Sequence, residues 1–200
     1  VDNGRIQGVA AGTAVITAAA ANGVSAQVEV SVQEVIAEKV DIEGPGEITI
    51  GDETQLRAVV TPSNTTYPEV EWASDDESIA TVSDDGKVSA VGVGKVTISA
   101  VQKDIQTEVT IQVLSIPVEN IEIITDDEFG GALTEEETTQ LTATVYPENA
   151  TYPEVAWSTS DESIAVVDNS GFLTAVSKGD VTIYARTTDG AEETLEVHIR

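Results

Sequence analysis

Residues 67–98 read YPEVEWASDDESIATVSDDGKVSAVGVGKVTI, and residues 152–183 repeat most of this stretch as YPEVAWSTSDESIAVVDNSGFLTAVSKGDVTI. Trp72 and Trp157 occupy the same place in the two copies, 85 residues apart (157 − 72). The same spacing separates Gln55 from Gln140, Gly86 from Gly171 and Gly94 from Gly179. Self-similarity at one fixed spacing is the signature of repeated structural units, so the sequence predicts tandem modules.

The repeat defines two complete modules and a truncated one. Residues 38–114 (module 2) and 118–200 (module 3) carry the whole pattern, whereas residues 1–34 match only the C-terminal half of a module, 82 residues before their counterparts. These counterparts are Gly4 with Gly86, Ile6 with Val88, Gly12 with Gly94, Ala14 with Val96 and Ile16 with Ile98. Because half a module cannot close a two-layer core, we expect residues 1–34 to be poorly ordered or paired with a neighbouring module or molecule.

Apolar and polar residues alternate along most of the chain. Hydrophobic residues make up 40% of the sequence and aromatic residues only 4%, and the prevailing Val and Ile fit a pleated surface. Short strands separated by Pro and Gly turns are typical of a β-sandwich, so the expected fold class is all-β. The strands expected in module 2 span 40–42, 47–50, 55–61, 70–73, 79–82, 87–91, 95–101 and 107–113.

The chain is strongly acidic, with 36 Asp and Glu against 9 Lys and Arg and a net charge of −27. Nucleic acids and anionic membranes need a basic surface, so the charge argues against both as partners. The apolar run 9–21 is too short for a membrane helix and follows the repeat, so we expect no membrane insertion in this segment. Cysteine is absent, which excludes disulfides and thiolate metal sites.

The joins between modules are short. Residues 34–39 (EVIAEK) and 114–119 (LSIPVE) contain no Gly/Ser-rich spacer, and Pro117 fixes one backbone angle of the second join. We therefore expect the modules to stack as a fairly stiff rod. Module 3 departs from the repeat near its start, where Val40 matches Ile121 at a spacing of 81, so the loop Thr125–Glu137 holds about four extra residues (85 − 81) and is acidic.

One set of residues recurs in both complete modules. In module 2 it comprises Leu56, Thr61-Pro62, Trp72, Ser78-Ile79-Ala80, Val82, Gly86-Lys87-Val88, Gly94 and Val96-Thr97-Ile98; in module 3 it comprises Leu141, Pro147, Trp157, Ser163-Ile164-Ala165, Gly171, Gly179 and Val181-Thr182-Ile183. This set resembles the bacterial immunoglobulin-like domain family, group two. The resemblance implies an immunoglobulin-like sandwich of the kind found in bacterial surface proteins, in adhesins of the intimin and invasin type and in some phage structural proteins. It implies no catalytic residues.

Trp72 and Trp157 are the largest side chains of the repeat. Alternation places Val70 and Trp72 on one face of their strand, so we expect both tryptophans to lie between the sheets. The alternative is an exposed platform on which a sugar ring stacks. Burial is favoured because an indole removes about 150–250 Å² from water.

Several loops carry carboxylates or a glycosylation sequon. Asp75-Asp76-Glu77 with Asp84-Asp85, and Asp161-Glu162 with Asp168, offer the oxygen ligands that calcium prefers, but neither group matches an EF-hand loop. We favour solvated loops and predict no metal site and no cofactor. Asn64-Thr65-Thr66 and Asn149-Ala150-Thr151 are formal sequons, which the turn preference of Asn after Pro62 and Pro147 explains equally well.

Catalytic signals are weak. His198, the single histidine, alternates with inward-facing Val197 and Ile199, so it should face solvent near the chain end. Carboxylate pairs suited to acid and base chemistry are expected from the composition alone. The prediction is that the chain is not an enzyme.

Tandem modules, short joins and an acidic exterior together indicate a non-enzymatic stalk or adhesion segment of a bacterial cell-surface protein, located at the cell surface or outside the cell. Its expected partners are neighbouring Ig-like modules and a host protein or glycan. Two alternatives stay open. The loops of module 3, especially 125–137, could bind a host protein or glycan directly, or the chain could be an accessory spacer of a secreted enzyme or a phage structural protein.

Overall fold

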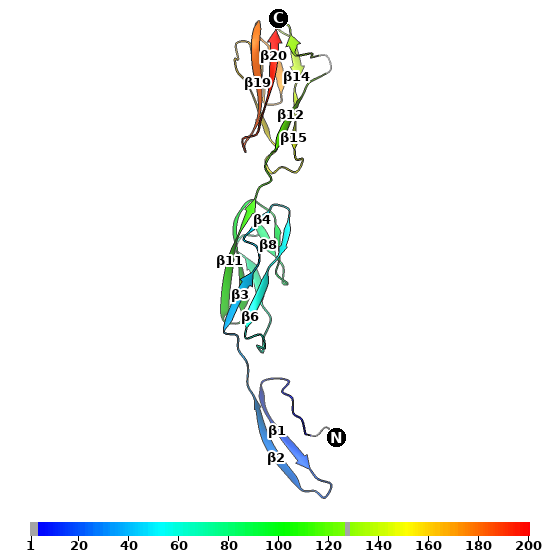
Figure 1. The fold of residues 1–200 in the computed structure, drawn as a ribbon, viewed down its shortest axis with the longest axis vertical. Helices are drawn as coiled ribbons and strands as arrows, with labels where there is room; N and C mark the ends of the chain where they lie inside the picture. The colour runs from blue at the N-terminus through cyan, green and yellow to red at the C-terminus, as the bar shows by residue number, and fades with distance from the viewer. Residues whose placement is uncertain (1–3, 127–128) are drawn as a thin grey trace. The chain divides into compact units, whose positions relative to one another are not determined.

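The computed structural model describes residues 4–126 and 129–200, and every regular element in these ranges is a β-strand. The chain divides into two compact units, Val1–Val113 and Leu114–Arg200 (Figure 1). The expected all-β fold class is therefore confirmed. The described part of the chain contains no helix with the length and apolar character needed to cross a membrane.

The first unit begins with a hairpin of β1 (Gly12–Ala19) and β2 (Ser25–Val32). Its turn contains Asn22 and Gly23: Gly23 has a φ of +85°, and Asn22 Oδ1 accepts a hydrogen bond of 3.2 Å from the Val24 N–H. The structure confirms the strand interpretation of the apolar run 9–21. Along both strands every residue is exposed or half-buried, so the hairpin by itself encloses no core.

Nine further strands follow in the first unit and form module 2. They are β3 (Lys39–Glu43), β4 (Glu47–Thr49), β5 (Glu53–Gln55), β6 (Arg57–Thr61), β7 (Glu71–Ser74), β8 (Ala80–Val82), β9 (Lys87–Ala90), β10 (Gly94–Gln102) and β11 (Ile105–Leu114). One layer has the order β4-β11-β10-β7, and the other consists of β3-β6 and β5-β9-β8. Leu56 alone separates β5 from β6, so one strand path links the two parts of the second layer.

The interruption at Leu56 corrects the expectation of one unbroken strand over residues 55–61. The Leu56 N–H donates to the carbonyl oxygen of Gly86 at 2.8 Å, outside the ladders of β5 and β6. Its side chain is only 1% exposed and belongs to the core between the layers. Leu56 therefore leaves the regular ladder at the point where its side chain enters the core.

Nine buried residues from both layers form the core of module 2. They are Ile48, Leu56, Ala80, Val88, Ala90, Val96, Ile98, Ile111 and Val113. Along β10 the buried residues Val96, Ile98 and Ala100 alternate with partly exposed ones, as the period of two predicts. Burial of such a two-sided apolar interface is the main driving force for folding a module that has no disulfide.

The second unit repeats this architecture as module 3. Its strands are β12 (Asn120–Ile124), β13 (Ala132–Leu133), β14 (Thr138–Gln140), β15 (Thr142–Tyr146), β16 (Val155–Thr159), β17 (Ala165–Val167), β18 (Phe172–Ala175), β19 (Gly179–Thr187) and β20 (Glu192–Ile199). One layer has the order β13-β20-β19-β16, and the other consists of β12-β15 and β14-β18-β17. β13 pairs with β20 in parallel, and the other strand pairs of this unit are antiparallel.

Each tryptophan packs on the core of its module, as expected, and is half-buried there. Gly86 and Gly171 lie directly against the two rings: a Cβ on Gly86 would be 3.0 Å from the ring of Trp72 and 2.8 Å from the Leu56 carbonyl oxygen. Both glycines also have a positive φ, +83° and +82°. Glycine is therefore required at these positions both by the space beside the ring and by the positive φ.

Gly86→Ala is expected to destabilise module 2 by about 2–5 kcal/mol, because left-handed backbone strain adds to overpacking against Trp72 and Leu56. Gly51→Ala is the matched control, since Gly51 has a φ of +88° and nothing within 4 Å of an added Cβ. It should cost only about 1–2 kcal/mol. Urea unfolding in a Trp157→Phe background, where fluorescence reports on Trp72, measures both, and equal losses would contradict the role given to the ring contact.

Candidate functional site

The join before module 2 is bound to the body of that module by backbone and hydroxyl hydrogen bonds. The Val35 N–H donates to Thr66 Oγ1 at 2.8 Å, and the Thr66 N–H donates to the Val35 carbonyl oxygen at 2.8 Å. The Thr65 hydroxyl donates to the same carbonyl at 3.0 Å. Three residues further on, the Glu38 N–H donates to the Thr61 carbonyl oxygen at 2.7 Å. The join is therefore part of the folded module.

The join before module 3 uses the same contacts at equivalent positions. The Ile116 N–H donates to Thr151 Oγ1 at 2.7 Å, and the Thr151 N–H donates to the Ile116 carbonyl oxygen at 2.8 Å. The Glu119 N–H donates to the Tyr146 carbonyl oxygen at 2.8 Å. Ala150 replaces Thr65, so this join lacks the third hydroxyl contact.

These contacts give the two sequons a structural role. Thr66 and Thr151 are the sequon threonines, and their hydroxyls accept the join N–H groups. Asn64 and Asn149 are exposed in the turns just before them. The turn interpretation thus accounts for both sequon residues. The role of the threonine was not explained by the sequence alone.

Each join has a further contact of its own. At the first, the Tyr67 hydroxyl donates to Glu34 Oε1 at 2.8 Å, which raises the pKa of Tyr67, and Lys103 Nζ lies 3.8 Å from Glu34 Oε2. At the second, the Val118 N–H donates to Asp189 Oδ2 at 2.7 Å. The Thr187 hydroxyl and the Val118 N–H, both donors to Asp189, hold the pKa of this carboxyl below its ordinary value. The first join thus has an ion pair between Lys103 and Glu34, whereas at the second join the Asp189 carboxylate accepts a backbone hydrogen bond.

The acidic loops use their carboxylates to hold turns. Asp76 accepts hydrogen bonds from the Ser78 hydroxyl at 2.6 Å and the Ser78 N–H at 2.9 Å, and Asp161 binds Ser163 with the same geometry. These bonds lower the pKa of both aspartates. The hydroxyl bonds of Ser83 and Ser170 likewise lower the pKa of Asp85 and Asp168. Among the described residues, no three His, Asp or Glu side chains form a group able to hold a metal ion.

The loop peculiar to module 3 is anchored at both ends. Its extra residues precede β13, because β12 ends at Ile124 and β13 begins at Ala132, whereas β3 and β4 are separated only by residues 44–46. Phe129 is 5% exposed and belongs to the core of module 3. The Thr139 hydroxyl donates to Asp126 Oδ2 at 2.9 Å. The buried role of Phe129 was not predicted; an aromatic residue within an acidic loop is its only sequence signal. Residues 127–128 lie outside the described part of the chain.

His198 lies on the exposed face of β20, as alternation predicts. Its Nδ1 is 2.6 Å from Asp180 Oδ1 on the neighbouring strand β19. The pair is a cross-strand contact at the surface. No nucleophilic side chain is seen bonded to the histidine among the described residues.

A family comparison completes the assignment of the fold. The model of the bacterial Ig-like domain (group 2) matches residues 45–113 and 124–197, that is, most of modules 2 and 3. The chain belongs to this family. The predicted resemblance and the tandem Ig-like sandwich modules are thereby confirmed.

Relatives of the chain are diverse. An uncharacterised protein of Clostridium acetobutylicum is 33% identical over 138 residues, which are 68% of this chain and 14% of that protein. An Ig-like virion protein of Serratia phage KSP90 is 30% identical over 149 residues, 71% of this chain and 56% of that protein. An alpha-L-arabinofuranosidase of Bifidobacterium longum is 48% identical over 58 residues, 29% of this chain and 5% of the enzyme. The chain thus spans only part of the length of each of these relatives.

Among solved structures, the adhesin InvE of Yersinia pseudotuberculosis resembles the chain with a TM-score of 0.41 and 16% identity. The match covers 81% of this chain and 58% of the adhesin.

Thr151→Val is expected to release the second join. Valine keeps the shape of threonine but leaves the Ile116 N–H without its acceptor, so module 3 should lose about 1 kcal/mol and the Ile116 amide should exchange roughly 5–10-fold faster. Thr142→Val, on an exposed position of β15, is the matched control. Hydrogen exchange followed by NMR measures the effect, and unchanged exchange at Ile116 would remove the proposed role of the hydroxyl.

The contact between Asp189 and Val118 is expected to weaken in acid. The pKa of Asp189 is lowered in the folded state, so its stabilising effect is complete above the unfolded value of about 3.9 and is lost as the pH falls through the lower folded value. The Val118 amide shift should follow this titration with a midpoint below about 3.9. Asp189→Asn should abolish the titration. A midpoint at or above the ordinary aspartate value would show that the contact does not hold in solution.

Proposed function

We propose that this chain is a non-enzymatic spacer segment of a bacterial surface protein, in which successive Ig-like modules carry a binding region away from the cell envelope. The observation that carries the proposal is the docking of both joins. In each case the join residue, Val35 or Ile116, exchanges two hydrogen bonds with a threonine of the module that follows. A spacer needs joins that are held by the fold, because free linkers would let the modules reorient independently.

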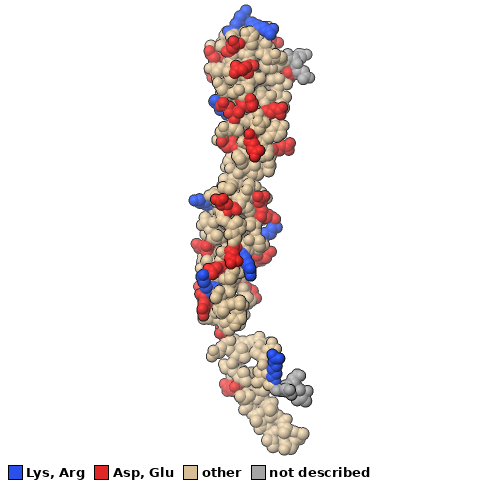
Figure 2. All heavy atoms as spheres, in the orientation of Figure 1, with Lys and Arg blue, Asp and Glu red and all other residues tan. Residues whose placement is uncertain are grey.

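The charge distribution supports an exposed role. Figure 2 shows acidic side chains scattered over both modules on the visible face, with few basic ones among them. Many of these carboxylates face solvent or hold surface turns, as Asp76 and Asp161 do. A dispersed negative surface keeps a chain soluble and repels other copies. This suits a segment outside the cell or at its surface, with neighbouring Ig-like modules as its constant partners.

Two kinds of relative support a spacer more broadly. This chain is similar to stretches of an Ig-like virion protein and of an arabinofuranosidase, where the matched stretch is 5% of the enzyme. In such proteins a small Ig-like module can serve as an accessory to a different activity. If the parent protein is a secreted enzyme or a phage structural protein, the modules would still act as a spacer that separates other parts of that protein.

Direct binding of a host protein or glycan is the second candidate, and the loop of module 3 favours it. This loop adds residues found in module 3 but not in module 2, and Phe129 and Asp126 fix it to the module. A hollow of about 100 Å³ beside it is lined by residues that include Asp126, Phe129, Leu133 and Thr139. A loop held at both ends loses less entropy on binding than a free one.

The spacer proposal predicts coupled motion of modules 2 and 3. Amide ¹⁵N relaxation should give the two modules one common tumbling time, because docking of the second join at Thr151 and the fixed φ of Pro117 limit reorientation. The double variant Pro117→Gly with Thr151→Val should separate the two times. If each module of the unaltered chain already tumbles like an isolated domain, the spacer proposal fails.

A binding screen separates the two candidates. The chain is tested against immobilised matrix proteins and glycans, with calcium and with chelator, beside a variant in which residues 125–131 are replaced by residues 44–46. A passive spacer gives no saturable binding with either form. Saturable binding that is lost with the replaced loop would instead establish module 3 as a binding module.

A further inference from the structure

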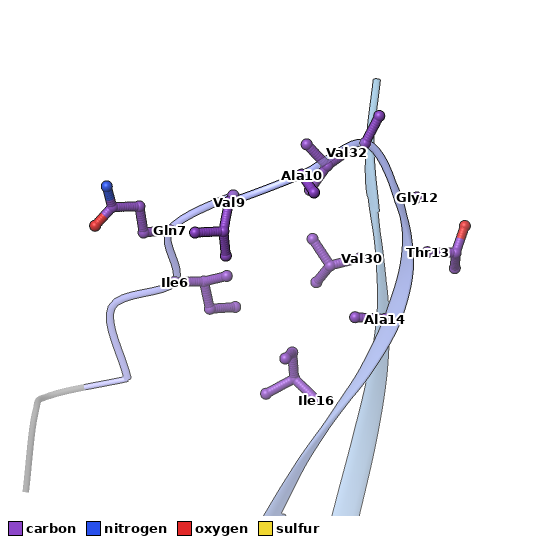
Figure 3. A pocket seen from close by; sticks show the side chains of 12 residues that line it. Ile6, Gln7, Val9, Ala10, Gly12, Thr13, Ala14, Ile16, Val30 and Val32 are labelled. Carbon is purple, nitrogen blue, oxygen red and sulfur yellow. The ribbon is translucent and has the colours of Figure 1, made fainter. Parts of the chain in front are cut away.

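The hairpin β1–β2 and the segment before it enclose an apolar groove. The groove has a volume of about 360 Å³ and is shown in Figure 3. Ile6 enters from the preceding segment, Ala14 and Ile16 from β1, and Val30 and Val32 from β2; they face the same space. Several of these side chains are exposed, Ile6 to 50% and Ile16 to 39%. A contiguous apolar surface of this kind marks a contact site.

The residues of the groove match one half of the core of module 2. The spacing of 82 aligns Ile6, Gly8, Ala14 and Ile16 with Val88, Ala90, Val96 and Ile98. The strand registers align Val30 and Val32 with Ile111 and Val113, since Ala14 pairs with Val30 as Val96 pairs with Ile111. Six of the nine buried residues in the core of module 2 thus have counterparts around the groove. In module 2 the four counterparts on β10 and β11 are at most 1% exposed.

The three core residues without counterparts identify what the groove lacks. They are Ile48, Leu56 and Ala80, which come from the first half of the module, together with Trp72 packed against them. The groove itself is lined by small residues, including Gly8, Ala10, Ala11 and Ala14. Because these lining residues have small side chains, the groove has room for large side chains from a binding partner. Ile, Leu and Trp side chains therefore fill the space better than a second copy of the same alanine-rich face would.

Charge separates the hairpin from the rest of the chain. Between residues 4 and 33 the charged residues are Arg5 and Glu29, although the whole chain carries 36 acidic residues. Figure 2 shows this part largely free of acidic side chains on the visible face. An apolar, almost uncharged surface is suited to burial rather than to solvent.

We propose that the groove binds the front half of a group 2 Ig-like module, a polypeptide segment with counterparts of β3 to β8. The tryptophan strand of that segment pairs with the free edge of β1. In module 2, Trp72 of β7 lies opposite Ala100, and Ala73 lies opposite Ser99. The counterparts of Ala100 and Ser99 on β1 are Ala18 and Thr17, so the register of the incoming strand is fixed. This proposal is independent of the spacer role.

A chimera tests the proposal. A copy of residues 34–85 is placed directly before Gly4, so that its last residue precedes Gly4 as Asp85 precedes Gly86. Because β1 and β2 enclose no core by themselves, we expect the Ile16 and Val30 amides to exchange fast in the unaltered chain. In the chimera they should slow at least about 100-fold and approach the protection of Ile98 and Ile111. The same chimera with Trp72→Ala in the copy is the matched control and should lose most of the gain.

The register is tested separately, because the chain has no cysteine of its own. Thr17→Cys combined with Ala73→Cys in the copy should form a disulfide, as Ser99→Cys with Ala73→Cys should within module 2. The proposal is overturned if Ile16 and Val30 stay unprotected in the chimera and this disulfide fails to form while the control pair in module 2 forms. It is also overturned if the unaltered chain sediments as a dimer that Ile16→Ser dissociates, since the occupant would then be a second copy.

Discussion

Every module of this chain depends on covering the apolar face of one β-layer with the other. Val96 and Ile98 on β10 are buried because Leu56, Ala80 and Val88 of the other layer lie in the same core. A pleated strand with alternating side chains has one apolar face that must be shielded from water. A single layer leaves this face exposed, so a second layer has to cover it. The hairpin β1–β2 shows the consequence: the same pattern forms the same strand pair, but its apolar face remains exposed.

The joins between modules also depend on contacts with a folded module. Val35 makes three hydrogen bonds and Ile116 makes two to the module after it, and in each case two of them are with Thr66 or Thr151. At about 0.5–1.5 kcal/mol for each bond, docking of Val35 or Ile116 is favoured on the order of 1–4 kcal/mol, or about 5- to 1,000-fold. Each join is therefore docked most of the time.

Much of the fold followed from the sequence because it rests on repetition and period-two alternation, which are visible in one chain. The tandem Ig-like modules and most of their strands are of this kind. The break at Leu56, the burial of Phe129 and the hydroxyl contact of Thr151 were not predicted. Each depends on a partner from a distant part of the chain, such as the carbonyl of Gly86 for Leu56, and no local pattern reveals such a partner.

The two modules also show which contacts can change during divergence. Trp, Gly and the join threonine recur in both, because each meets backbone or core atoms that other residues could not accommodate. The surface contacts differ: Glu34 with Tyr67 and Lys103 holds the first join, and Asp189 holds the second. The exposed ion pair of Lys103 with Glu34 contributes little stability, so a module can replace it with a different surface contact as long as the N–H groups of Val35 and Ile116 stay bonded. Such exchange lets modules with different surfaces keep one kind of join.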